Sequence, residues 1–241
     1  MRSANFIEKE VRNAKNVCGN KQQILNFHNH AYIIIVIASM AHFPPADELH
    51  SPLFASQKFS WEALTEIIKE QRFDSLRRSI KQQRFYCNYS HTLKLNWKSI
   101  YDFILHSKFN YEMIAVPETA EMFHSTFVEY DEADCEGDIS LLPNIPPPPP
   151  GNKWEARRPT DESNMKNRAL AKNDFPYYLE DGVEHWCLWK LGDDVTNEDI
   201  DCGMDELKGR GIYAEILHWI NPVHLKSLPD IDHAHFVCLR K

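Results

Sequence analysis

The sequence predicts an α+β fold in which a helical N-terminal layer packs on a small, mainly antiparallel sheet. Apolar residues recur at helical spacing between residues 59 and 112. After residue 170, short aromatic and apolar runs alternate with turn-forming residues, which is typical of strands. We therefore expect one α+β domain over 56–241, interrupted at about 115–165 by an acidic, proline-rich insertion and preceded by a poorly defined segment, 1–55.

The composition supports a buried core and disfavours some partners. Hydrophobic residues make up 43% of the 241 residues and aromatic residues 12%, which is enough to bury a core. The net charge of −8 argues against a nucleic-acid partner, because such proteins carry a basic surface. The 6 cysteines form no C-x-x-C pair and follow no secretory signal, so we expect free thiols in a cytoplasmic protein.

The most apolar stretch, residues 31–43, is too short to predict a membrane helix. It holds 13 residues, AYIIIVIASMAHF, whereas a spanning helix needs about 20. We expect a buried strand at Tyr32–Ala38 and no association with membranes. His28 and His30 nearby would form an incomplete metal site, so we expect them to be exposed.

Three helical segments are expected between residues 59 and 112. Ser60 is placed to cap a helix that begins at Trp61. A second helix is predicted after Asp74, with a basic outer face that we interpret as solvated, formed by Arg77, Arg78, Lys81 and Arg84. A third segment, 97–105, has an apolar stripe that is typical of core packing.

The insertion combines an acidic cluster at 129–138 with a proline run at Pro146–Pro150. Consecutive prolines favour an extended polyproline II conformation, so we interpret the segment as a mobile spacer. An SH3- or WW-type domain is the class of partner that such a run could recruit. In that case the protein would be a non-catalytic scaffold.

The C-terminal part predicts two strands around a short helix. Residues 185–190, HWCLWK, have the aromatic content of a strand. Thr196 is placed to cap a helix with Asp199 three residues later, and Gly209 should end it. Residues 212–220 fit either a strand or a helix, and residues 233–239, HAHFVCL, predict a closing strand.

The most specific feature is the pair His233 and His235 in the closing strand. Side chains alternate across a strand, so both imidazoles should share a face toward a cleft or solvent. Two adjacent imidazoles can bind a metal, move protons or hold a phosphate, which makes both candidate catalytic residues. The sequence leaves open a second interpretation, in which both are partly exposed and hydrogen-bonded to the backbone.

Further residues near the pair could complete a site. A metal would need at least one more protein ligand, and the candidates are Asp230, Asp232, His185, His218 and His224. An anionic ligand could be held by polar and aromatic side chains, for which the candidates are Asn221, Lys226, Ser227, His185 and Trp186. A solvated lysine, a turn serine and a core tryptophan are the competing interpretations. The metal and the cofactor stay unknown.

Several of these residues form a recognisable pattern: Asp174-Phe175-Pro176-Tyr177, Glu184-His185-Trp186 with Trp189, Asn221-Pro222, Lys226-Ser227, Pro229 and His233-x-His235. Together with FSWEALTEIIKEQRFDSLRRS at 59–79, the pattern resembles the N-acetylglucosamine-induced protein 1 family, which carries a domain of unknown function and is best represented in fungi. The resemblance covers about 59–112 and 170–241. It implies an intracellular protein in the response to N-acetylglucosamine or in amino-sugar metabolism.

An asparagine, a serine and then H-x-H on a closing strand are also reminiscent of histidine-triad nucleotide hydrolases and transferases, although Val237 stands where a third histidine would follow. Gly-rich phosphate loops, G-x-S-x-G and H-E-x-x-H are absent from the sequence. Three hypotheses follow: a protein that binds an anionic sugar or nucleotide sugar, a histidine-dependent phosphoester or nucleotide-sugar hydrolase or transferase, and the scaffold.

Overall fold

The computed structural model describes residues 54–119, 129–160, 166–226, 228 and 231–241. They belong to one compact unit that spans Ala46–Lys241. The expected strand at Tyr32–Ala38 and the histidines before residue 51 lie outside the described residues. None of the described helices is long and apolar enough to cross a bilayer.

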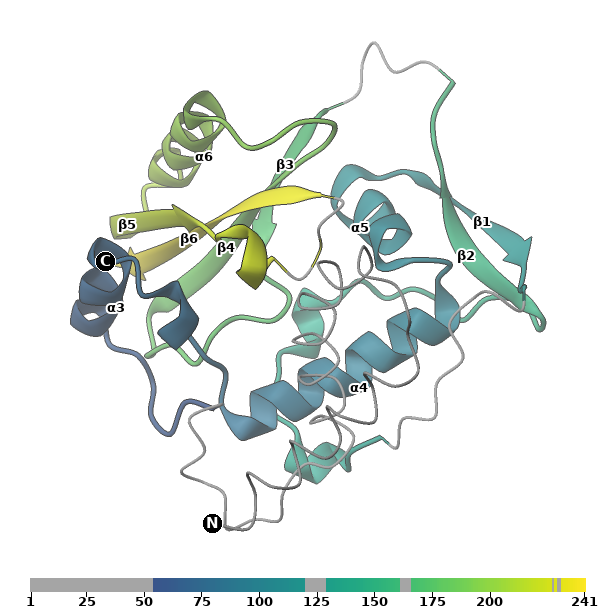
Figure 1. The fold of residues 1–241 in the computed structure, drawn as a ribbon, viewed down its shortest axis with the longest axis horizontal. Coiled ribbons are helices and arrows are strands. Elements are labelled where there is room, and N and C mark those ends of the chain that lie inside the picture. The colour runs from purple at the N-terminus through teal and green to yellow at the C-terminus, as the bar shows by residue number, and fades with distance from the viewer. Residues whose placement is uncertain (1–53, 120–128, 161–165, 227, 229–230) are drawn as a thin grey trace, which may run out of the picture. The chain divides into compact units, whose positions relative to one another are not determined.

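The described elements confirm an α+β fold (Figure 1). The helices are α3 (Trp61–Lys69), α4 (Ile80–Asn96), α5 (Ile100–Phe109) and α6 (Asn197–Gly209). The strands are β1 (Glu112–Pro117), β2 (Asn152–Arg157), β3 (Arg168–Lys172), β4 (Val183–Lys190), β5 (Tyr213–Ile220) and β6 (Asp232–Arg240). Residues 212–220, which the sequence left between two interpretations, thus contain a strand.

The main sheet has four antiparallel strands in the order β3-β4-β6-β5. Strand β6 lies inside it and pairs with β4 on one side and β5 on the other. His235 is opposite Cys187 of β4 and opposite Trp219 of β5, so the register gathers polar and aromatic residues at its centre. Alternation then divides β6 into a histidine face and an apolar face, as the sequence predicted.

The N-terminal helices cover the histidine face. Trp61, Leu64 and Ile67 of α3 pack with Trp219 and Val237 of the sheet. A second cluster joins Cys187, Trp189 and Ile231 to α4, to α5 and to the residues between them. The cluster residues from this helical part are Leu93, Trp97, Phe103 and Ile104. The predicted helical layer on an antiparallel sheet is confirmed.

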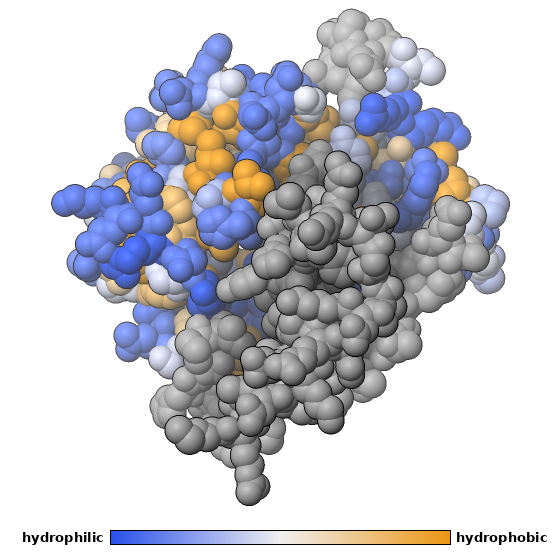
Figure 2. Space-filling model, viewed as in Figure 1, coloured by the Kyte–Doolittle hydropathy of each residue, from blue (hydrophilic) through white to orange (hydrophobic). Residues whose placement is uncertain are grey.

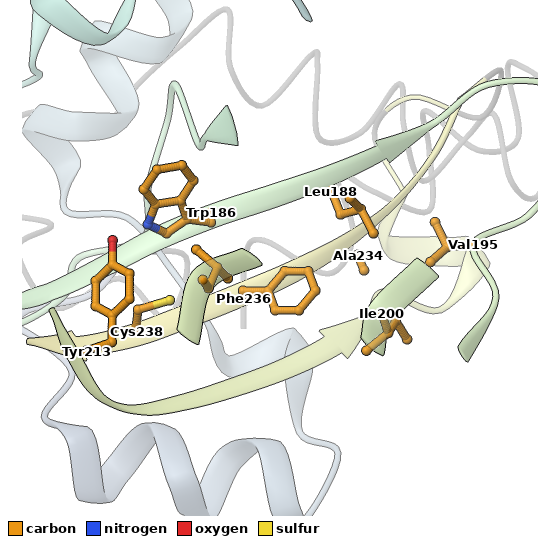
Figure 3. Packing of buried hydrophobic residues seen from close by; sticks show 9 residues of the cluster. Trp186, Leu188, Val195, Ile200, Tyr213, Ala234, Phe236 and Cys238 are labelled. Atoms are coloured by element: carbon orange, nitrogen blue, oxygen red, sulfur yellow. The ribbon is translucent and has the colours of Figure 1, made fainter. Parts of the chain in front are cut away.

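Helix α6 covers the opposite, apolar face. Trp186, Leu188, Ala234 and Phe236 pack there, together with Ile200 of the helix (Figure 3). The predicted N-cap is present, since the Thr196 side chain accepts from the Asp199 amide while the Asp199 side chain accepts from the Thr196 amide. The sheet is therefore a central layer between two helical layers.

The outward sides of the covering helices are polar. The exposed positions of α3 are Glu62, Thr65, Glu66 and Lys69, and those of α6 are mainly acidic or polar. Figure 2 shows hydrophilic residues over both helices. This pattern is the expected one for amphipathic helices that bury one side against a sheet.

The second predicted helix begins later than expected. Residues Phe73–Ser75 form a short 3₁₀ turn, and α4 starts at Ile80 because Ser79 and Gln82 form a capping box. Arg78 therefore precedes the helix, and its guanidinium donates to the Phe175 carbonyl at 2.9 and 3.1 Å. The predicted solvated basic face is wrong for Arg78, which ties this turn to the segment before β4.

The insertion holds more structure than a spacer would. Strands β1 and β2 pair across it, and both backbone groups of Tyr130 bond to the Asn88 side chain at 2.8 Å. The Trp154 indole donates to the Pro146 carbonyl at 2.8 Å. Most of the proline run is nevertheless exposed: Pro146, Pro147, Pro149 and Pro150. The acidic segment is thus held against α4, and the proline run contacts β2 within the insertion itself.

Candidate functional site

The candidate site is a buried cluster of three histidines between the sheet and the N-terminal helices. His185 lies on β4, and His233 and His235 lie on β6. Their exposed fractions are 4%, 5% and 5%. We expected these histidines to face a cleft or solvent, and this expectation is wrong. The histidines are buried because α3, α4 and α5 cover this face of the sheet.

His235 has hydrogen-bond partners at both ring nitrogens. The Trp219 indole N–H donates to Asn221 Oδ1 at 2.9 Å, which turns the amide nitrogen of Asn221 toward His235 Nε2 at 3.0 Å. Nε2 must then accept, so the proton of the neutral ring lies on Nδ1. Nδ1 in turn lies 3.0 Å from His185 Nε2 and 3.5 Å from Cys187 Sγ.

Aromatic rings surround the linked imidazoles. Trp219 stacks on His235 with ring centroids 5.0 Å apart, and Tyr177 stacks on His185 at 5.1 Å. Burial lowers the pKa of His185 to about 3 and holds the pKa of His235 well below its ordinary value. Both rings are therefore neutral at physiological pH and act as hydrogen-bonding groups rather than as cations.

His233 differs from His185 and His235 because one of its ring nitrogens, Nε2, has no hydrogen-bond partner among the described residues. Its Nδ1 faces the Ile231 carbonyl at 3.5 Å. Trp189 stacks on the ring with centroids 4.5 Å apart. The buried indole N–H of Trp189 also has no partner among the described residues. Burial lowers the pKa of His233 as well.

The other predicted ligand residues divide into four groups. Asn221 and His185 join the cluster, as described above. Trp186 lies on the opposite face of β4, in the core beneath α6. Lys226 lies near His233 in the chain but pairs with Asp232 at 2.5 Å. Ser227 lies outside the described residues.

The structure also selects among the proposed metal ligands. Of these, His185 joins His235, whereas His218 and His224 are exposed. Asp232 is used by Lys226 and the Val195 amide, and Asp230 lies outside the described residues. Cys187 completes the group, since its Sγ and one nitrogen of each of these two histidines lie within 4.8 Å of one another. Alternation along β4 was the signal that placed Cys187 on the same face as His185.

Tyr177 also belongs to the cluster, although nothing in the sequence predicted this role. It lies in the segment between β3 and β4, where the sequence indicates only turn chemistry. Burial raises the pKa of Tyr177, and a hydrogen bond with the Asn221 side chain opposes the rise. The tyrosine thus closes the cluster on the side of His185.

The fold and the site define a three-layer α+β protein with neutral imidazoles buried between its sheet and its N-terminal helices. The chain belongs to the family described as "Protein of unknown function (DUF3605)", whose model matches residues 60–239. No curated protein matches the chain. A solved structure titled "Crystal Structure of HTC1" is 17% identical with a TM-score of 0.38, over 76% of this chain and 86% of that one, a likeness too low to carry an argument.

Proposed function

We propose that the protein binds a phosphate-bearing small molecule, such as a sugar phosphate or a nucleotide sugar, at His233. The observation that supports this most is the pairing of two uncommitted groups, the His233 ring and the indole N–H of Trp189 stacked on it. An indole N–H is a donor. The neutral His233 ring donates from Nε2 only when its proton lies on that nitrogen, which costs the long 3.5 Å contact of Nδ1 with the Ile231 carbonyl. In that tautomer the ring and the indole can together donate to phosphate oxygens.

Lys226 lies beside the site as a partly buried cation. Its side chain is 18% exposed and pairs with Asp232 at 2.5 Å. Burial is the main cause of the lowered pKa of His233, and Asp232 raises that pKa by more than Lys226 lowers it. A phosphate could replace the Asp232 carboxylate as the partner of the Lys226 ammonium. The resemblance to the N-acetylglucosamine-induced family favours amino-sugar ligands. The free state of the described cysteines is compatible with action in the cytoplasm.

Ligand-dependent thermal unfolding tests this proposal. N-acetylglucosamine 6-phosphate and UDP-N-acetylglucosamine should raise the Tm of the native chain, whereas N-acetylglucosamine without phosphate should not. His233→Asn should abolish the rise. His218→Asn, which alters an exposed histidine of β5, should keep it. Equal shifts in both variants, or none in the native chain, would exclude a phosphate site at His233.

A second candidate is phosphoryl or nucleotidyl transfer with His233 as the nucleophile. The contact of Nδ1 with the Ile231 carbonyl places the proton on Nδ1 and leaves the Nε2 lone pair available. Nε2 would form a bond to phosphorus while the P–O bond to the leaving group breaks, and that oxygen keeps the electron pair. Water would then displace the imidazole, losing a proton to solvent. His235 is unsuited, because both of its nitrogens are engaged.

Single-turnover assays separate transfer from binding. If transfer occurs, incubation with a nucleotide sugar labelled in the phosphate attached to the nucleoside should leave label on the native chain, and His233→Asn should carry none. Ligand binding without labelled protein and without turnover would leave only the binding function.

A further inference from the structure

We propose that His185, Cys187 and His235 form a site for one thiophilic transition-metal ion, such as Cu⁺ or Zn²⁺. The three donors are His185 Nε2, Cys187 Sγ and His235 Nδ1, which lie within 4.8 Å of one another. They come from neighbouring strands whose pairing places Cys187 opposite His235. This inference does not depend on the phosphate site, whose central residue is His233.

Two of the three distances between the donors are close to those that one ion requires. Metal–nitrogen bonds of about 2.0 Å and metal–sulfur bonds of about 2.3 Å place tetrahedral ligands about 3.3 Å apart for two nitrogens and about 3.5 Å apart for nitrogen and sulfur. The Cys187 Sγ to His235 Nδ1 distance is 3.5 Å. The two histidine nitrogens are 3.0 Å apart, so this pair has to open slightly when an ion enters between them.

The donor types select the class of ion. A thiol sulfur with two imidazoles suits soft or borderline metals, whereas Mg²⁺ and Ca²⁺ prefer oxygen ligands. Binding replaces the thiol proton by the metal, and the proton leaves to solvent. One thiolate and two neutral imidazoles then neutralise a monovalent ion. Burial of net charge is costly, so the charge of this site favours Cu⁺ over Zn²⁺.

Asn221 and Trp219 surround the ligand residue His235, and their effect on metal binding can be tested. When a metal occupies His235 Nδ1, the ring proton moves to Nε2 and needs an acceptor. The amide of Asn221 presents its nitrogen there, because the Trp219 indole N–H holds its oxygen. The amide must turn over, and the indole then loses its acceptor. Trp219 therefore opposes the metal-bound form, and Trp219→Phe should strengthen metal binding while keeping an aromatic ring.

Anaerobic competition titrations with chromophoric chelators test the site. The native chain should bind one Cu⁺, and Zn²⁺ in a parallel series more weakly. Cys187→Ser should weaken binding at least tenfold. The matched control is Cys238→Ser, since Cys238 is as buried as Cys187 but lies on the other face of the sheet. Equal losses in the two serine variants, or no binding by the native chain, would overturn the proposal. Tighter binding of Zn²⁺ than of Cu⁺ would overturn the charge argument.

Spectroscopy on the native fold guards against variants that fail to fold. Co²⁺ added to the native chain should produce thiolate-to-cobalt charge-transfer absorption, which is absent in Cys187→Ser and present in Cys238→Ser. Trp219→Phe should raise the affinity several-fold, and an unchanged or lower affinity would refute the role assigned to Asn221. His233→Asn should retain the metal, whereas Cys187→Ser should retain the phosphate response, so the two sites fail independently.

Discussion

Asp174 and Lys108 form a buried ion pair at 2.7 Å, and each side chain is only 7% exposed. The pair joins α5 to the segment that precedes β4. Burial raises the pKa of Asp174 and outweighs the opposing effect of Lys108. Asp174 begins the Asp-Phe-Pro-Tyr pattern, so the structure assigns this first residue a packing role between two layers.

Replacing one member of the Lys108–Asp174 pair should be costly. Asp174→Asn leaves the Lys108 ammonium buried without a counter-charge, and we expect a loss of about 3–5 kcal/mol of unfolding free energy. Urea denaturation measures it. Asp181→Asn is the matched control, because Asp181 pairs with Lys58 at 95% side-chain exposure and should change the stability by less than about 1 kcal/mol. Equal effects would contradict the buried-pair argument.

Gly203 lies where α6 packs against Phe236 of the sheet. A Cβ atom at this position would be 3.0 Å from Phe236 Cζ, and the Phe236 side chain is fully buried. Gly203→Ala should therefore destabilise the protein, although alanine normally favours a helix by about 1 kcal/mol over glycine. Gly209→Ala on the same helix meets nothing within 4 Å and should not destabilise. Thermal unfolding of both variants checks the contrast.

Helix α6 is joined to the sheet by Asp199 as well as by its apolar side. The Asp199 carboxylate accepts from the Thr196 amide and hydroxyl, and from Arg168 of β3 and Lys190 of β4 at 3.0 and 3.1 Å. Burial alone would raise the pKa of Asp199, but these donors outweigh it and hold the pKa below its ordinary value of 3.8. One side chain thus caps the helix and fixes it to two strands.

The lowered pKa of Asp199 predicts a pH-dependent contribution to stability. The folded state holds this proton less tightly than the unfolded state, so the stabilisation is present above pH 3.8 and is lost as the pH falls toward the folded pKa. Asp199→Asn should cost about 2 kcal/mol near pH 7, with the difference shrinking below pH 4. Asp201→Asn, exposed on the same helix, is the control. A pH-independent difference would refute the assignment.

The elements were predictable where local signals are strong. The caps at Ser60 and Thr196 and the alternation in β4 and β6 are visible in the sequence, and they agree with the structure. The start of α4 was missed, because its capping box at Ser79 competes with the equally plausible cap at Asp74. The pairing of β1 with β2 was missed, because the strands lie far apart in the chain.

At the scale of the whole molecule, the sequence predicted which residues share the sheet face of the candidate site, but not what covers that face. Alternation along β6 places His233 and His235 on one face, and the same rule adds His185 and Cys187 from β4. Their burial could not be derived, since it depends on helices more than 75 residues earlier in the chain. The pairing of Lys226 with Asp232 likewise depends on loop geometry.

The contact between Asn88 and Tyr130 ties the acidic segment to the rest of the molecule. Asn88→Ala removes two hydrogen bonds of 2.8 Å, so residues 129–138 should become more accessible to proteases. Limited digestion should show faster cleavage there than in the native chain or in Asn96→Ala, at the far end of the same helix. Unchanged cleavage would show that other contacts hold the segment.

The inner position of β6 has a consequence for how the protein is made. Strands β4 and β5 each pair with β6 but not with each other, and β6 is the last of the described strands to be synthesised. The edges of β4 and β5 that pair with β6 therefore stay unpaired, and their apolar side chains stay incompletely packed, until residues 232–240 leave the ribosome. A chaperone that recognises unpaired strands would find its substrate during this interval.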